Sequence, residues 1–223
     1  MTSTWYELAA ESRGESAWEL YHENAKRSRD DGMPVRAAAP APQRDYSDLT
    51  ALALAPASSP ASPAPATSTA VPLPSLAELL HQAVTAVDEP VDVFVSIEAV
   101  TGLPECLGWY DARAGALRVI RDGRAGKDLD GALVTPGIRK RAGAIVFIAA
   151  DFELATAAAG ERGYRAALIA AGRRLYALEA AIERVALSAE PVEFYDREAD
   201  ALLRLGGLAQ SVVAAVAVLG KPG

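Results

Sequence analysis

The fold of this chain is decided by residues 160–187, GERGYRAALIAAGRRLYALEAAIERVAL. This stretch contains no proline, and its apolar positions recur in alternating steps of four and three residues: Tyr164, Leu168, Ala171, Leu175, Leu178, Ile182 and Val185. The spacing predicts a helix ~40 Å long with one buried apolar face. Small residues beside that face, among them Ala167 and Gly172, would let a second helix or a ligand approach the backbone closely.

Two kinds of fold could use such a helix. A coiled coil would bury the same stripe in a bare seam. The flanking segments favour a different architecture, because residues 145–150 are wholly apolar, as in a central strand, and residues 210–219 predict a last strand. Helices placed between strands indicate an α+β or α/β core.

The residues before this region predict a helix, a strand and a hairpin. Ser75 and Glu78 have the spacing of a capping box, so a helix is expected to begin there. Residues 91–100 alternate as a strand does, and residues 107–120 predict a hairpin with its turn at 112–115. After the long helix, Asp196 is expected to cap a short helix that ends near residue 205.

Two further segments precede the predicted domain, which covers residues 75–223. Residues 1–32 are predicted to be a helical arm, loosened at Gly14, with Trp5 and Trp18 among its anchors. Such an arm is expected to dock onto a neighbouring subunit or onto its own domain. Residues 33–74 are rich in proline, alanine, serine and threonine and predict a disordered or polyproline-like linker.

The composition argues against several kinds of protein. A formal net charge of −7 and a pI near 5.0, without a basic block, argue against a nucleic-acid surface. The single Cys106 cannot form an internal disulfide, and neither it nor the two histidines has metal-ligand spacing. No export signal and no apolar run of membrane-spanning length is present. We therefore expect a cytoplasmic protein without a metal site or a membrane partner.

Four motifs resemble those of one family. They are GERGYRAALIAAGR at 160–173, the strand and hairpin at 91–123 with the phrase GLPECLGWYD, YHENAK at 21–26, and VAVLGKP at 216–222. Together they resemble the nitroreductase superfamily and, within it, the SagB-type dehydrogenases. Those flavin enzymes oxidise azolines to azoles in ribosomally made peptide natural products.

The resemblance implies an α+β fold of nitroreductase type. In it, a mixed sheet is enclosed by helices, a long helix lies at the centre, and the N-terminal helical arm is attached by the linker. The resemblance also implies FMN as cofactor and a homodimer or heterodimer with flavin sites at the subunit interface. A precursor peptide is a further expected partner.

Several family features are missing from this sequence. The arginine-rich segment that holds the flavin phosphate is absent, since no lysine or arginine occurs between Arg44 and Arg113. Asp88, Glu89 and Pro90 stand where a Pro-Ser-Gly-type phrase is expected, and carboxylates there would repel a phosphate. Two alanines at 158–159 replace the Lys-Tyr pair expected to transfer protons. Residues 187–193 replace a glycine-rich segment with bulk and charge.

Three cations remain as candidate cofactor-binding residues: Arg162, Arg165 and Lys221. Arg162 and Arg165 fall in the first turn of the long helix, where the helix dipole would strengthen their attraction for an anion. The alternative is that both are surface arginines bonded to carboxylates such as Glu161. No catalytic residue is identified.

The leading hypothesis is therefore a degenerate, non-catalytic subunit, a pseudoenzyme that pairs with a flavin-bearing dehydrogenase. One alternative is that the chain is itself an FMN-dependent azoline dehydrogenase, an oxidoreductase with unconventional anchoring of the cofactor. Another is a peptide-binding or scaffold protein with no redox role.

Overall fold

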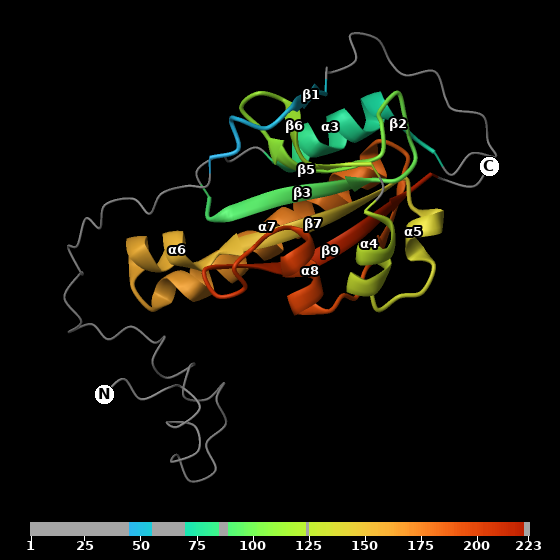
Figure 1. The fold of residues 1–223 in the computed structure, drawn as a ribbon. Coiled ribbons are helices and arrows are strands. Elements are labelled where there is room, and N and C mark those ends of the chain that lie inside the picture. Colours follow the sequence, from blue (N-terminus) through green and yellow to red (C-terminus); the bar gives the residue numbers. More distant parts are fainter. Residues whose placement is uncertain (1–44, 55–69, 85–88, 124, 221–223) are drawn as a thin grey trace.

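The computed structural model describes residues 45–54, 70–84, 89–123 and 125–220. The predicted arm at 1–32 lies outside these residues. The helices and strands in chain order (Figure 1) are β1 Ala51–Ala53, β2 Val71–Pro72, α3 Leu73–Ala83, β3 Val91–Ile97, β4 Val100–Thr101, β5 Cys106–Asp111, β6 Ala116–Asp122, α4 Gly126–Ala132, α5 Ile138–Arg141, β7 Ala144–Asp151, α6 Phe152–Ala159, α7 Arg162–Arg184, β8 Ser188–Pro191, α8 Asp196–Leu202 and β9 Gln210–Leu219.

A seven-stranded sheet with the order β1-β6-β5-β3-β7-β9-β8 forms the centre of the fold. Each neighbouring pair in this sheet is antiparallel, and a parallel pair occurs in the separate ladder of β2 and β4. β7 lies between β3 and β9 and is buried from Ala144 to Ala150, which confirms the predicted apolar central strand. The predicted bounds of β9 and the hairpin of β5 and β6 are also confirmed.

Helices cover both faces of this sheet, which confirms the α+β class. α3 and α7 pack on one face, against Val93, Val95 and Ile97 of β3. α4, α5 and α8 cover the other face, around Phe94 and Phe147. The alternation along β3 explains this division, because successive side chains point to opposite sides of a strand. Among the described helices, none combines the length and the apolarity that crossing a membrane requires.

The predicted long helix is present as α7, but a second helix, α6, comes directly before it. Asp151 caps α6, since its Oδ1 accepts a hydrogen bond from the Leu154 N–H at 2.8 Å. Gly160 ends α6 with a φ of +62°, a conformation that favours glycine. The chain then reverses, and the two helices meet so closely at Gly163 that an added Cβ would lie 2.1 Å from the Ala155 carbonyl oxygen.

This close contact changes which face of α7 is buried. Leu178 and Ile182 lie in the core as predicted. Near the start of α7, however, Tyr164 and Leu168 are exposed, and small residues such as Ala167 are buried instead. The predicted continuous stripe is therefore wrong for the first turns, because the packing of α6 on α7 leaves room only for small side chains.

Two predicted helix caps are also wrong. α3 begins at Leu73 with Pro72 as its N-cap residue, so Ser75 lies inside the helix and the capping box does not form. Proline is tolerated in a first turn because its missing N–H would have no helical partner there. In α8 the N-cap residue is Tyr195, and no side chain caps the helix, so Asp196 does not have the predicted role.

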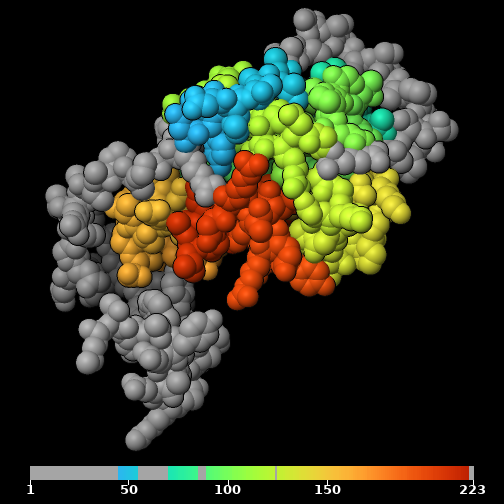
Figure 2. Space-filling view, viewed as in Figure 1, coloured from blue at the N-terminus to red at the C-terminus, as the bar shows by residue number. Residues whose placement is uncertain are grey.

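Part of the predicted linker belongs to the sheet. Residues 45–54 form a turn and strand β1, which pairs with β6. Figure 2 shows this segment (blue) lying beside the green surface of the β5–β6 hairpin. The linker prediction is therefore wrong for these residues, because Tyr46 and Leu54 supply apolar side chains that pack against the two cores.

The close contact between α6 and α7 at Gly163 can be tested by a substitution that adds one methyl group. Gly163→Ala should lower the free energy of unfolding by about 1–3 kcal/mol, since the helices must move apart. Urea denaturation measures this change. Gly172→Ala is the matched control in the same helix, because its Cβ would meet nothing within 4 Å. That variant should gain up to about 1 kcal/mol. Equal effects of the two changes would contradict the close helix contact.

Candidate functional site

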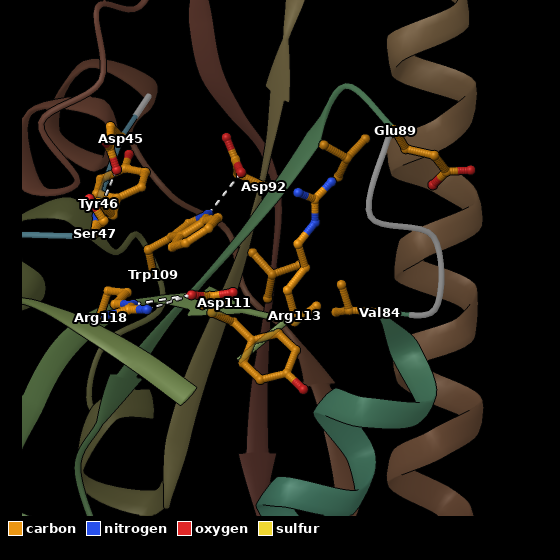
Figure 3. Close-up of a pocket in the computed structure, with 14 residues that line it drawn as sticks. Asp45, Tyr46, Ser47, Val84, Glu89, Asp92, Trp109, Asp111, Arg113 and Arg118 are labelled. Carbon is orange, nitrogen blue, oxygen red and sulfur yellow. Dashed lines mark hydrogen bonds and ion pairs between the residues drawn. The ribbon is translucent and has the colours of Figure 1, made fainter. Parts of the chain in front are cut away.

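A pocket of about 230 Å³ lies where β3 begins, β5 ends and α3 ends (Figure 3). We call it the hairpin pocket, and its lining residues are Asp45, Tyr46, Ser47, Val84, Glu89, Val91, Asp92, Val93, Trp109, Tyr110, Asp111, Ala112, Arg113 and Arg118. They come from segments that are far apart in the sequence. Residues 45–47, from the segment predicted as linker, form one side of the pocket.

The aromatic side of the hairpin pocket is built on Trp109 of β5. Tyr46 stacks on Trp109 with ring centroids 4.8 Å apart, and it meets Phe94 edge to face at 6.2 Å. The Trp109 Nε1–H donates to Asp92 Oδ1 at 2.8 Å. This hydrogen bond fixes the indole and gives the half-buried carboxylate a donor.

A row of polar groups continues from Asp92 along the end of the sheet. The Gln210 side-chain amide donates to Asp151 at 2.6 Å and lies 3.5 Å from Asp92. Asp151 in turn caps α6, as described above. These hydrogen bonds therefore link β3 and β9 to the start of helix α6.

Carboxylates outnumber cations in the hairpin pocket. Its lining includes four carboxylates and two guanidinium groups. Asp111 accepts hydrogen bonds from Arg118 Nε at 3.1 Å and from Nη2 at 2.9 Å. At the rim, the hydrogen bonds from Ser47 hold the pKa of Asp45 below its ordinary value, so this group stays ionised near neutral pH. The balance of charge does not suit a phosphate dianion.

Glu89 is held in this pocket by a buried arginine of α7. Arg174 is only 4% exposed, and it donates to the Ala83 carbonyl oxygen at 2.6 Å and to Glu89 at 3.0 Å. Burial lowers the pKa of Arg174, while the charge of Glu89 opposes that shift. Arg173 also approaches Glu89, at 3.4 Å. The sequence alone suggests that Glu89 would repel a phosphate, whereas in the structure its charge is balanced by arginine.

Arg174 was not among the residues predicted from the sequence, although its position in the helix offered a signal. It lies four residues before Leu178, on the buried face of α7. An arginine at such a position needs a hydrogen-bonded partner. Its partners at Ala83 and Glu89 are some 90 residues away in the sequence, so the spacing alone could not identify them.

Two of the candidate cofactor-binding residues, Arg162 and Arg165, do not line the hairpin pocket. Arg162 is exposed and Arg165 is half-buried, both at the start of α7. Within the described ranges neither forms an ion pair with Glu161, the alternative considered from the sequence. Lys221 lies outside the described residues, and its role stays a prediction. The described residues contain no group of three or more His, Cys, Asp or Glu side chains arranged to hold a metal ion.

Solved structures match this chain, whereas no protein-family model matches and no curated protein matches. A protein of Anabaena variabilis named as a nitroreductase gives a TM-score of 0.72 at 16% identity, over 93% of this chain and 47% of that one. A chain of the E. coli microcin synthetase McbBCD complex, solved with truncated pro-MccB17 bound, gives 0.59 at 15% identity, over 96% and 86%. A Ralstonia eutropha protein, also named as a nitroreductase, gives 0.52 at 16% identity, over 82% and 89%.

The chain therefore has the nitroreductase fold, as its sequence motifs led us to expect. It spans about half the length of the Anabaena protein. The nitroreductase fold typically binds FMN. In the hairpin pocket the residues do not fit the FMN phosphate, because Arg118 is already bonded to Asp111 and the carboxylates of Asp45 and Asp92 also line the pocket.

The buried ion pair of Arg174 can be tested by removing the guanidinium. Arg174→Met should lower the free energy of unfolding by about 3–5 kcal/mol, because Glu89 and the Ala83 carbonyl group lose a buried partner. Chemical denaturation measures the loss. Arg173→Met is the matched control, since that side chain is 67% exposed, and it should change stability by less than about 0.5 kcal/mol. Similar losses for both variants would contradict the role given to Arg174.

Cys106 should be chemically inert in the folded protein. Burial raises the pKa of its thiol to about 11, and the nearby Asp122 charge adds to the shift. At pH 8 only ~0.1% of the thiol is then ionised, so reaction with a disulfide reagent such as Ellman's should be slow. In denaturant the thiol becomes exposed and should react at the ordinary fast rate. Rapid labelling of the native protein would contradict the burial of this residue.

Proposed function

We propose that this chain is a degenerate, non-catalytic subunit in the azole-forming oxidation of a ribosomally made peptide. It pairs with a flavin-bearing dehydrogenase of the same fold and completes or stabilises that partner's site. In this proposal the partner supplies the FMN and the redox chemistry. The precursor peptide is the substrate of the assembly.

The ion pair of Glu89 and Arg174 carries this proposal. It lies before β3, where the family resemblance expects small residues that expose their backbone to a flavin. Here the position holds a carboxylate, and a buried guanidinium keeps it in place at 3.0 Å. A ligand that needs this volume would have to separate Glu89 from the buried guanidinium of Arg174, which is costly because that charge would lose its partner. The carboxylate-rich lining of the hairpin pocket supports the same conclusion.

The comparison with the microcin synthetase supports the kind of assembly proposed. That matching chain belongs to a multi-protein complex with a bound peptide. The similarity extends over 96% of the present chain. Association with other subunits and with a precursor peptide is accordingly part of the proposal.

The second candidate function is that of an FMN-dependent azoline dehydrogenase. The position of Arg162 and Arg165 favours it, because both lie at the N-terminal end of the 23-residue helix α7, where the helix dipole attracts anions. Lys221 would be the third cation of this anchor. A scaffold that binds peptide without redox chemistry is the third candidate, and no described feature favours it over the other two.

The flavin content of the purified chain tests the proposal. Expressed alone, the chain should give a colourless preparation without a flavin absorbance band. Expressed together with a nitroreductase-like dehydrogenase encoded beside it, the chain should co-purify as a heteromer that contains FMN.

A yellow preparation of the chain alone would contradict the proposal. If the flavin were then lost in the variant Arg165→Ala, the second candidate would replace the first. Tight binding of precursor peptide by the chain alone, with no heteromer formed, would favour the scaffold.

A further inference from the structure

Residues 45–54 are held on the domain by two sets of contacts, and we call this segment the strap. The first set is a short ladder, in which β1 pairs with β6 over three residues, whereas β3 and β7 pair over seven. The Leu54 N–H donates to the Gly115 carbonyl oxygen at 2.9 Å, and the Thr50 carbonyl oxygen accepts from the Val119 N–H at 2.9 Å. In Figure 2 the strap is the blue segment beside the β5–β6 hairpin.

The second set of contacts is apolar and includes the aromatic side of the hairpin pocket. Tyr46 stacks on Trp109 and meets Phe94 edge to face, as described above (Figure 3). Tyr46 and Leu49 pack on the core around Phe94, and Leu54 belongs to the core under α3 and α7. Six of the ten strap residues are exposed. The strap is therefore held by few side chains.

The surface beneath the strap is fixed by bonds that do not involve the strap. The Trp109 Nε1–H donates to Asp92, and the Arg118 guanidinium donates two hydrogen bonds to Asp111. β6 is also paired with β5, and β5 with β3, by ladders of their own. This surface should therefore keep its shape when the strap is released. An element with a short ladder and few buried side chains opens at a lower free energy than the centre of a sheet.

The sequence on either side of the strap has the composition of a linker. Residues 55–69 consist of alanine, proline, serine and threonine alone, and residues 33–44 include three prolines. Such compositions predict a linker, and both stretches lie outside the described residues. A segment joined to its domain by a linker can leave the surface and return to it at a high effective concentration.

We propose that the strap is a lid on the hairpin pocket, which opens as one unit while the rest of the domain stays folded. Asp45, Tyr46 and Ser47 line the pocket, so release of the strap removes one of its sides. It also uncovers the face of Trp109 on which Tyr46 lies. The open pocket therefore admits a larger ligand than the closed one and offers it an aromatic surface for stacking. The proposal does not depend on flavin binding or on a partner dehydrogenase.

Hydrogen exchange of single amide protons in the full-length chain, followed by NMR, tests the lid. The Leu54 and Val119 N–H groups report on the strap, because their hydrogen bonds join it to the β5–β6 hairpin. The Phe147 N–H reports on the whole domain, since β7 lies in the middle of the sheet. After correction for intrinsic rates, exchange at Leu54 and Val119 should be at least ~100-fold faster than at Phe147.

The variant Gly163→Ala separates opening of the strap from unfolding of the domain. It destabilises the contact between α6 and α7, which Figure 1 shows away from β1. Exchange at Phe147 should become at least ~5-fold faster, whereas exchange at Leu54 and Val119 should stay within ~2-fold of the unsubstituted chain. An equal gain at all three amides would overturn the proposal, because the strap would then open only when the domain unfolds.

The variant Tyr46→Ala tests whether the strap opens as one unit. It removes the ring that stacks on Trp109, whereas the reporter amides of Leu54 and Val119 lie at the β1 end of the strap. If Tyr46 leaves Trp109 whenever β1 opens, exchange at both reporters should rise together by at least ~10-fold. Asp48→Ala is the matched control, since that side chain is exposed, and it should change neither rate. Unchanged exchange at Leu54 in Tyr46→Ala would mean that the strap opens in pieces and would overturn the proposal.

Discussion

A single buried guanidinium connects the long helix α7 with the end of α3 and with the residue just before β3. Arg174, in the middle of α7, donates to the last turn of α3 and to the carboxylate just before β3. A buried guanidinium needs an opposite charge, which Glu89 supplies at 3.0 Å. The position of α7 along α3 and the path of the chain into β3 are therefore fixed together. Of the residues that line the hairpin pocket, Glu89 is held by this ion pair.

The elements with the clearest hydrophobic pattern could be predicted from the sequence. β7 and β9 are apolar over most of their length, and α7 has a helical period over most of its residues. α6 was missed because its sequence FELATAAA has no clear polar face and is separated from α7 only by Gly160 and Glu161. The buried side of α7 could not be assigned correctly near Tyr164, since it depends on the approach of α6 at Gly163.

The candidate site was harder to predict from the sequence than the fold was. The missing cations and the acidic residue before β3 were visible in the sequence. Two other features were not, because each arises from contacts between distant segments. Tyr46 lies in a stretch whose composition is that of a linker, yet it stacks on Trp109. The charge of Glu89 is balanced by a residue 85 positions further along the chain.

The two edge strands of the sheet, β1 and β8, affect how the protein can associate with other molecules. β1 has three residues, and β8 has four and ends in Pro191, which has no N–H to donate. Glu190 of β8 is also ion-paired with Arg141 through two hydrogen bonds. Short, charged or proline-containing edge strands are poor templates for an additional strand. Aggregation by pairing of edge strands is therefore disfavoured at both edges of the sheet. Association with other molecules is more readily made through side chains on the helices.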